Sequence, residues 1–288
     1  MDASATGTLY VVATPIGNLE DITLRALRIL REVDLVAAED TRRSRQLLQH
    51  YGIATPLVSL HEHNERTRGR ELVARLRAGS SVALVTDAGT PGVSDPGAAF
   101  VRTARAQGIR VDPVPGPSAV TAALSASGLE MERFAFAGFP PVRPKDRKAW
   151  LAWVESLSSV AVVLFEAPHR IHKTLAVLRD YLADRPITVV RELTKLHESW
   201  TSWPAHASID VTTVPPRGEF VVLVGPREVA GDEREAAHTP SDAEIAARFG
   251  RTTNYTSRRE AVRAVAGQLG LPVKHVYEAL ERAKSAEN

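Results

Sequence analysis

The sequence predicts an α/β protein with two subdomains, followed by a small helical domain. Short apolar segments rich in β-branched residues alternate with segments of helical periodicity between residues 8 and 225. The segment 113–118, PVPGPS, interrupts this alternation with three prolines and a glycine, and beyond residue 240 only helical patterns remain. We therefore expect an N-terminal α/β subdomain at 8–115, a C-terminal α/β subdomain at 116–226, a linker at 227–240 and a helical domain at 241–288.

The expected strands are the apolar segments, and the expected helices lie between them. The helix predicted after Pro168 has one apolar face, which should pack on a sheet, formed by Ile171, Leu175, Leu178 and Leu182. Four glycines each follow an amphipathic stretch, where positive φ can close a last helical turn: Gly52, Gly79, Gly108 and Gly128. The predicted strands are 8–15, 33–40, 81–89, 109–116, 160–167, 186–193 and 219–225.

The C-terminal region is predicted to be helical from its capping signals. Two serine–glutamate pairs have capping-box spacing, Ser241 with Glu244 and Ser257 with Glu260. The last helix begins with Pro272 in its first turn, and we expect one apolar face, made of Val273, Val276, Tyr277 and Leu280. The helix, glycine turn and helix of AVAGQLGLPVKHVYEAL resemble a helix-turn-helix.

The composition excludes several kinds of chemistry. The 288 residues contain no cysteine, which excludes disulfides, thiolate nucleophiles and cysteine-bound metals. No apolar run reaches about 18 residues and the N-terminus lacks a signal-peptide pattern, so we expect a cytoplasmic protein without a membrane segment. The net charge of +2 is uneven: residues 248–288 hold eight Lys/Arg and four Asp/Glu. A basic tail suggests a polyanionic partner or a solvated helical surface.

Nucleotide-binding and metal motifs are absent from the sequence. It has neither GxxxxGK[ST], nor GxGxxG, nor HExxH. The histidines of HEH at 61–63, and the set of Glu166, His169 and His172, have spacings that favour structural roles over metal binding. We expect no metal. What remains is a set of strand-end loops rich in Gly, Pro, Asp and Ser, and ligands of open α/β sheets bind at such loops.

Seven motifs in these loops resemble one known family. TPIGNLEDIT, AAEDTR, LHEHNE, DAGTPGVSDPG, PGPSA, EAPHR and RELTK match, in order and spacing, the ribosomal RNA small-subunit methyltransferase I group of the tetrapyrrole (corrin/porphyrin) methylase superfamily. The resemblance implies a tetrapyrrole-methylase-like fold, a homodimer, and S-adenosylmethionine bound between the subdomains. It further implies methylation of a cytidine ribose 2'-hydroxyl in the decoding region of 16S ribosomal RNA within the small ribosomal subunit.

The same resemblance implies a set of cofactor-binding residues. Two departures from the family stand at EAPHR, where Phe165 and Ala167 replace its usual tyrosine and serine, and at GFPPVRPK, where the family usually has GFLP followed closely by lysine. The expected cofactor-binding residues are Ile16, Ala88, Gly89, Thr90, Val93, Ser118, Ala119, Phe165, Ala167 and Gly218.

Methyl transfer to an alcohol needs a group that accepts the hydroxyl proton. We expect this group among Glu192 and Lys195 of RELTK, followed by Glu39 and Asp40 of AAEDTR, although Glu192 and Arg191 could equally form a structural ion pair. RNA phosphates require cations. The expected RNA-binding residues are Arg42, Arg43, Arg143, Lys145, Arg147, Arg258 and Arg259.

Two other functions use the same features. A tetrapyrrole methyltransferase would share the fold and cofactor, but TPIGNL differs from the first loop of the porphyrin branch. A helix-turn-helix DNA-binding regulator would explain the tail, but not so many polar loops at one sheet edge.

Overall fold

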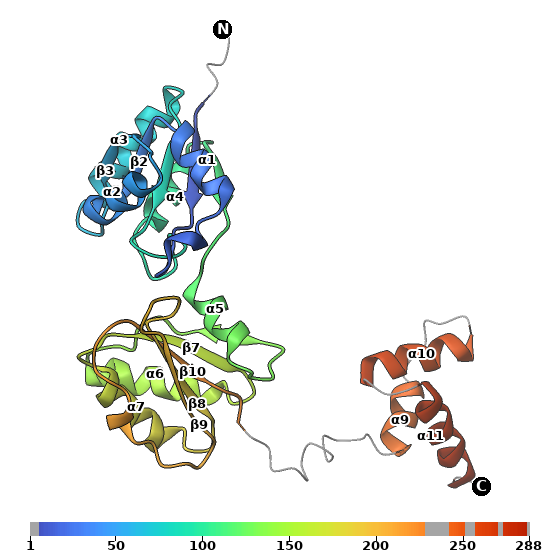
Figure 1. Ribbon diagram of the computed structural model, residues 1–288. Helices are drawn as coiled ribbons and strands as arrows, with labels where there is room; N and C mark the ends of the chain where they lie inside the picture. Colours follow the sequence, from blue (N-terminus) through green and yellow to red (C-terminus); the bar gives the residue numbers. More distant parts are fainter. Residues whose placement is uncertain (1–5, 228–241, 251–256, 270–272, 287–288) are drawn as a thin grey trace. The chain divides into compact units, whose positions relative to one another are not determined.

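The computed structural model describes residues 6–227, 242–250, 257–269 and 273–286 (Figure 1). The chain divides into two compact units, Met1–Glu228 and Val229–Asn288. The first unit contains two β-sheets and the second contains helices.

The first sheet is fully parallel, with helices on both faces. Its strand order is β3-β2-β4-β1-β5. Alternate residues of β2 point to opposite faces: Val36 and Ala38 pack with α1 and α2, whereas Leu35 and Ala37 pack with α3 and α4. The strands are β1 (Thr8–Val12), β2 (Leu35–Ala38), β3 (Leu57–Ser59), β4 (Val82–Val85) and β5 (Arg110–Val114). The helices are α1 (Leu24–Glu32), α2 (Thr41–His50), α3 (Glu65–Arg77) and α4 (Ala98–Ala106), with a 3-10 turn η1 (Leu19–Asp21).

The strand order brings the loops after β1 and β4 together. The chain leaves β1 toward β2 on one side and leaves β4 toward β5 on the other, so these adjacent strands have connections in opposite directions. Ligands of open α/β sheets bind at such a point. The Thr14 amide donates to the Gly89 carbonyl (2.8 Å) and the Gly89 amide to the Thr14 carbonyl (3.0 Å), which joins the two loops.

One carboxylate of the LHEHNE motif caps helix α4. Glu65 Oε1 accepts hydrogen bonds from the amides of Gly97 (3.1 Å), Ala99 (2.8 Å) and Phe100 (3.0 Å). Amides at the start of a helix have no partner within the helix, and an anion there also interacts favourably with the helix dipole. In the same motif, Asn64 Oδ1 accepts from the His61 amide (2.9 Å), so both side chains have structural roles.

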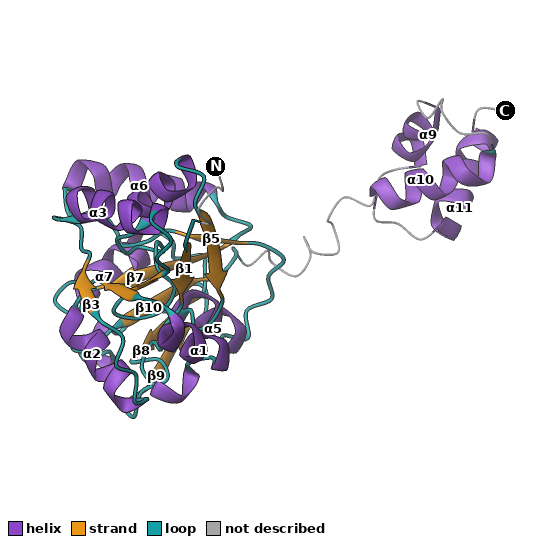
Figure 2. Ribbon diagram, turned by 90° about the horizontal axis from the view of Figure 1, so that it is seen from above, coloured by secondary structure: helices purple, strands orange, loops and turns teal. Residues whose placement is uncertain are grey.

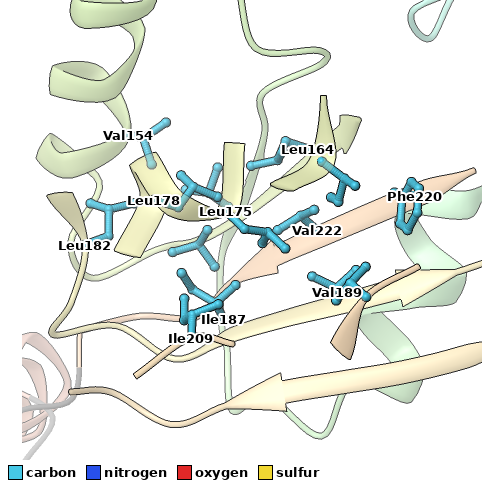
Figure 3. Packing of buried hydrophobic residues seen from close by; sticks show 14 of the residues in the cluster. Val154, Leu164, Leu175, Leu178, Leu182, Ile187, Val189, Ile209, Phe220 and Val222 are labelled. Carbon is cyan, nitrogen blue, oxygen red and sulfur yellow. The ribbon is translucent and has the colours of Figure 1, made fainter. Parts of the chain in front are cut away.

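The second sheet is mixed, in the order β6-β7-β10-β8-β9, with only β6 and β7 parallel. Helix α5 packs on one face, and helices α6 and α7 pack on the other, where Figure 3 shows Leu175 and Leu178 with Val222. The strands are β6 (Phe134–Phe136), β7 (Ala161–Glu166), β8 (Ile187–Arg191), β9 (Ser199–Trp203) and β10 (Phe220–Val224). The helices are α5 (Ala119–Ala126), α6 (Pro144–Ser156) and α7 (Ile171–Tyr181), with a 3-10 turn η2 (Val211–Thr213).

The structure confirms the seven predicted strands and adds three within residues 6–227, β3, β6 and β9. The three additions lie at sheet edges, where few apolar residues are needed. All four predicted helix-ending glycines have positive φ, and the predicted apolar face of α7 is fully buried. The boundary predicted at 115/116 falls between β5 and α5, but both sheets belong to one compact unit, so that boundary stays a prediction.

The second unit contains helices α9 (Asp242–Gly250), α10 (Arg258–Leu269) and α11 (Val273–Ala286) (Figure 2). Apolar residues from all three helices form its core. Ser257 Oγ accepts from the Glu260 amide (3.2 Å), as its predicted capping role requires. Val276 and Leu280 are buried as predicted, whereas Val273 is 40% exposed because it begins its helix beyond the core. Ser241, Pro272 and almost all of the predicted linker lie outside the described residues. Among the helices described, none has the length and apolar character to cross a membrane.

Candidate active site

A cavity of about 390 Å³ lies between the loops of the first and second sheets. Its size is typical of small-molecule sites. Loops after β1, β4, β5, β7 and before β10 all contribute to the wall. The structure brings all ten expected cofactor residues to this wall: Ile16, Ala88, Gly89, Thr90, Val93, Ser118, Ala119, Phe165, Ala167 and Gly218.

Hydrogen bonds and a close backbone approach hold the loops of the first sheet around the cavity. Thr14 Oγ1 donates to the Thr86 carbonyl (3.1 Å), and Thr90 Oγ1 donates to the Pro117 carbonyl (3.3 Å). Gly89 has φ +80°, a conformation that L side chains rarely adopt, and a Cβ there would lie 3.4 Å from Ile16 Cγ2. The DAGTP loop therefore needs glycine at its tip to reach the TPIG loop.

Gly17 is needed for contact between the two sheets. A Cβ at Gly17 would lie 2.5 Å from Lys195 Cγ and 2.7 Å from Thr194 Oγ1. The glycine after Ile16 thus lets the first loop approach the RELTK loop of the second sheet. This close approach explains a single glycine where dinucleotide-binding proteins have several for a pyrophosphate.

Five carboxylates line the cavity, and three of them come from the first sheet: Glu39, Asp87 and Asp95, which we refer to as the acidic cluster. Thr86 Oγ1 donates to Glu39 Oε2 (2.7 Å), and the Asp40 amide donates to Asp87 Oδ1 (3.0 Å). Burial, together with the charges of Glu39 and Asp87, raises the pKa of Asp95 to about 6. Burial also raises the pKa of Asp87, although the Asp40 amide acts in the opposite direction. Arg43, the cation on this wall, has Nη1 3.5 Å from Asp87 Oδ2.

Asp40 itself lies at the start of helix α2 and is not on the cavity wall. It accepts from the Arg42 amide (2.8 Å) and from Arg42 Nη2 (2.9 Å). The hydrogen bond from the Arg42 guanidinium lowers the pKa of Asp40 to about 2. A carboxylate this acidic is a weak proton acceptor, and the geometry gives Asp40 the role of a helix cap.

Glu192 and Lys195 form an ion network at the edge of the cavity. Lys195 Nζ is 3.0 Å from Glu192 Oε1 and 2.8 Å from Glu219 Oε2, and the Glu219 amide donates to Glu192 Oε1 (2.8 Å). Glu219 lines the cavity, whereas Glu192 and Lys195 do not. Burial acts to raise the pKa of Glu192, but the Glu219 amide and Lys195 outweigh it and the pKa is lowered. Arg191 instead donates to the carbonyls of Arg217 and His197.

The expected RNA-binding residues lie in three places. Arg42 and Arg43 are at the start of α2, and Arg143, Lys145 and Arg147 are at the start of α6. Arg259 is exposed on α10 in the second unit, and nothing is described for the side chain of Arg258. Arg147 already uses one of its donors within the protein, because its Nε donates to the Pro141 carbonyl (3.0 Å).

Several residues of the wall were not singled out from the sequence. Asp87 and Asp95 stand in the DAGTPGVSDPG motif, but a single sequence gives no sign of which carboxylate becomes buried. Glu166, which the sequence analysis considered only for a metal site, also lines the cavity; its side chain is fully buried and pairs with Arg170 (3.1 Å). Phe139 and Glu219 also line the cavity, the former in the GFPP segment and the latter beside Gly218.

Comparisons with known proteins identify the relatives of this chain. Residues 8–207 match the family of tetrapyrrole (corrin/porphyrin) methylases. The chain is 52% identical to ribosomal RNA small subunit methyltransferase I of Pseudomonas aeruginosa over 76% of this chain and 78% of that protein. It is 42% identical to the protein of the same name from Synechocystis sp. over 94% of this chain and 96% of the relative.

Solved structures share the fold at low sequence identity. Diphthine synthase superposes with a TM-score of 0.64 at 18% identity, covering 80% of this chain and 94% of that chain. Uroporphyrin-III C-methyltransferase from Thermus thermophilus, complexed with S-adenosylhomocysteine, gives a TM-score of 0.54 at 21% identity over 76% of this chain and 97% of that chain. The chain is therefore a methyltransferase that belongs to the tetrapyrrole (corrin/porphyrin) methylase family, within the ribosomal RNA small subunit methyltransferase I group.

Proposed function

We propose that this protein transfers a methyl group from S-adenosylmethionine to the 2'-hydroxyl of a cytidine in the decoding region of 16S ribosomal RNA. Methylation of small-subunit ribosomal RNA is the activity named for its relatives. The cavity between the two sheets is the observation that carries the proposal, since it gathers all ten expected cofactor residues and the acidic cluster.

The cofactor is S-adenosylmethionine, and the chemistry of the cavity fits it. When bound, this cofactor supplies a methyl group on a positively charged sulfur, and it also carries an ammonium group. The acidic cluster complements these positive charges and would repel a phosphate group. Ile16, Ala88, Gly89, Thr90 and Val93 would hold the cofactor from the first sheet. The predicted C-terminal subdomain would add Ser118, Ala119, Phe165, Ala167 and Gly218.

Among the carboxylates on the cavity wall, Asp95 is the proton acceptor in this proposal. In the reaction, the hydroxyl oxygen forms its bond to the methyl carbon while the carbon–sulfur bond breaks, and the hydroxyl proton passes to a carboxylate. A base is most effective when its pKa lies near the working pH, and the pKa of Asp95 is raised to about 6. Glu39 also lines the cavity and is the second candidate; the Thr86 hydroxyl donates to it (2.7 Å) and also interacts with Asp95.

Glu192 and Lys195 have a different role in this proposal. Lys195 bridges Glu192 and Glu219, and this network fixes the position of Glu219 at the cavity edge. Substitution of Glu192 and of Asp95 shows which of the two accepts the proton. If Glu192→Gln abolished turnover with cofactor binding intact, while Asp95→Asn kept normal turnover, then Glu192 would be the base.

The RNA would approach over the exposed cations at the start of α2 and α6. Contacts of this kind bind phosphates without reading sequence, so the target nucleotide has to be selected by shape. Arg43 on the cavity wall, and Arg143 and Lys145 at the start of α6, would hold the RNA backbone. A homodimer acting in the cytoplasm is part of the proposal, and sedimentation analysis tests its oligomeric state.

The test is methylation of small ribosomal subunits purified from a strain that lacks this protein. Incubation with purified protein and labelled S-adenosylmethionine should label 16S ribosomal RNA at one nucleotide, and the methylated ribose should resist alkaline cleavage at that position. Methylation of uroporphyrinogen with no transfer to subunits would support a tetrapyrrole methyltransferase. Specific retention of DNA without methyl transfer would support a regulator.

A further inference from the structure

Phe139 is a large apolar residue that lies on the cavity wall and yet is half exposed. The residue retains 50% of its accessible surface. A single exposed apolar residue is common on a protein surface, so the position of Phe139 on the cavity wall, and not its exposure alone, suggests contact with a ligand. The question is which ligand the ring meets.

The backbone around Phe139 is held firmly on both sides. The Phe165 amide donates to the Gly138 carbonyl (2.9 Å), and Arg170 Nη2 donates to the Pro140 carbonyl. The carbonyl of Pro141 accepts from Arg147 Nε (3.0 Å). Because the residues on both sides of Phe139 are hydrogen-bonded, the ring is exposed on an anchored segment.

Aromatic contacts fix the ring as well. The Phe139 and Phe165 ring centroids are 5.6 Å apart at an interplanar angle of 62°, and Phe165 makes a similar contact with Phe136 (4.9 Å, 65°). Edge-to-face packing of this kind is favourable and orients the rings. A preorganised aromatic ring binds a flat ligand at a small cost in conformational entropy.

Phe139 lies close to the loop of Asp95 and to exposed cations. A Cβ at Gly138 would lie 3.6 Å from Ser94 Oγ, so this segment adjoins the loop that carries Asp95. Arg143 and Lys145 follow within six residues, and both are exposed. Enzymes that act on a nucleotide stack its unpaired base on aromatic side chains and bind its phosphates with cations.

We propose that Phe139 is the platform on which the base of the target nucleotide stacks. The base would lie on the ring at the cavity rim, the ribose would face the loop of Asp95, and the phosphates would meet Arg143 and Lys145. This inference deepens the proposed function and rests on it, because it takes RNA as the substrate.

The experiment compares four variants of the full chain. Phe139→Ala removes the ring, Phe139→Trp keeps an aromatic face, and Phe139→Leu keeps only apolar bulk. Phe134→Ala is the matched control, because Phe134 on β6 is 48% exposed and does not line the cavity. For each, kcat and KM are measured with small subunits from a strain lacking the protein, and affinity for S-adenosylhomocysteine is measured by calorimetry.

Phe139→Ala should raise KM for the subunits by about 5- to 150-fold, the range that base–aromatic stacking gives. Affinity for S-adenosylhomocysteine should stay within about twofold, Phe139→Trp should recover most of the loss, and Phe134→Ala should behave as wild type. Equal rescue by Phe139→Leu, parallel loss of cofactor affinity, or a changed oligomeric state would each overturn the stacking role. If the wild-type protein failed to methylate subunits, the proposed function itself would be wrong.

Discussion

In the proposed mechanism, Asp95 accepts a proton, and its position in the cavity has a cost in stability. Its pKa is raised to about 6 from an ordinary value of 3.8, chiefly by burial and by the charge of Glu39. Between these two values the folded protein binds more protons at Asp95 than the unfolded chain does. The contribution of Asp95 to the free energy of unfolding therefore falls as pH rises through this window.

Replacement of Asp95 by asparagine should separate stability from turnover. Because the variant has no carboxylate to ionise, its Tm should exceed that of wild type at pH 8 and match it near pH 4. Turnover of wild type should rise with pH through about 6, and the variant should lose about 100-fold or more without that rise. Thermal unfolding and pH–rate profiles measure both effects. A variant that kept the wild-type profile would exclude Asp95 as the proton acceptor.

At Gly17, close neighbours in the second sheet leave no space for a side chain. In Gly17→Ala the new methyl group would overlap Lys195 and Thr194, so the free energy of unfolding should fall by about 1–3 kcal/mol. Cofactor affinity should fall too, since Ile16 beside it lines the cavity. Gly69→Ala is the control, because a Cβ in helix α3 would meet Phe100 at an ordinary 3.7 Å. That variant should be neutral or more stable by up to about 1 kcal/mol in denaturant titrations.

At the scale of elements, helix α4 depends on a side chain from another helix. Glu65 of α3 accepts hydrogen bonds from three amides at the start of α4, immediately after the loop that carries Asp95. The cap thus attaches the start of α4, and with it the end of the loop that carries Asp95, to helix α3.

Loss of this cap should be measurable. Glu65→Ala should lower the free energy of unfolding by about 2 kcal/mol, because the amides lose a charged acceptor. Glu71→Ala, on the same helix, removes only an exposed pair with Arg68 and should change it by less than about 0.5 kcal/mol. Urea titrations of both variants provide the comparison, and equal effects would mean that the cap contributes little.

The sequence predicted where helices and strands lie better than it predicted which strands pair. Apolar runs and glycines located seven strands and four helix ends, because burial and positive φ leave local signals. The antiparallel pairing in the second sheet left no such signal, nor did the short edge strands. In the candidate site, motifs identified the loops, but the partial burial of Asp95 and the exposure of Phe139 depend on tertiary packing, which a single sequence does not show.

At the scale of the whole molecule, each of the two units has its own apolar core. Ile245, Val262, Val265 and Leu280 are buried within the second unit, and four separate clusters stabilise the first. Asp242 and Arg282 form a two-point ion pair (2.7 and 2.9 Å) between α9 and α11. Separate cores favour separate folding of the units.

Truncation after residue 228 should therefore leave a folded protein that still binds cofactor. Affinity for small ribosomal subunits should fall, and its dependence on salt concentration should become less steep, because cations such as Arg259 and Arg263 are removed. Calorimetry with S-adenosylhomocysteine and binding titrations at several salt concentrations test this. An unchanged salt dependence would mean that the second unit does not contact RNA.

The acidic cluster has a further consequence for selectivity inside a cell. Adenosine triphosphate is abundant and shares its adenosine with the proposed cofactor, so a cavity that recognised adenosine alone would be filled by the wrong molecule. Glu39, Asp87 and Asp95 would repel its phosphates, and the amides that begin α4 are already occupied by Glu65. The charges that attract a cationic methyl donor would thus also weaken competition from adenosine triphosphate for the cavity.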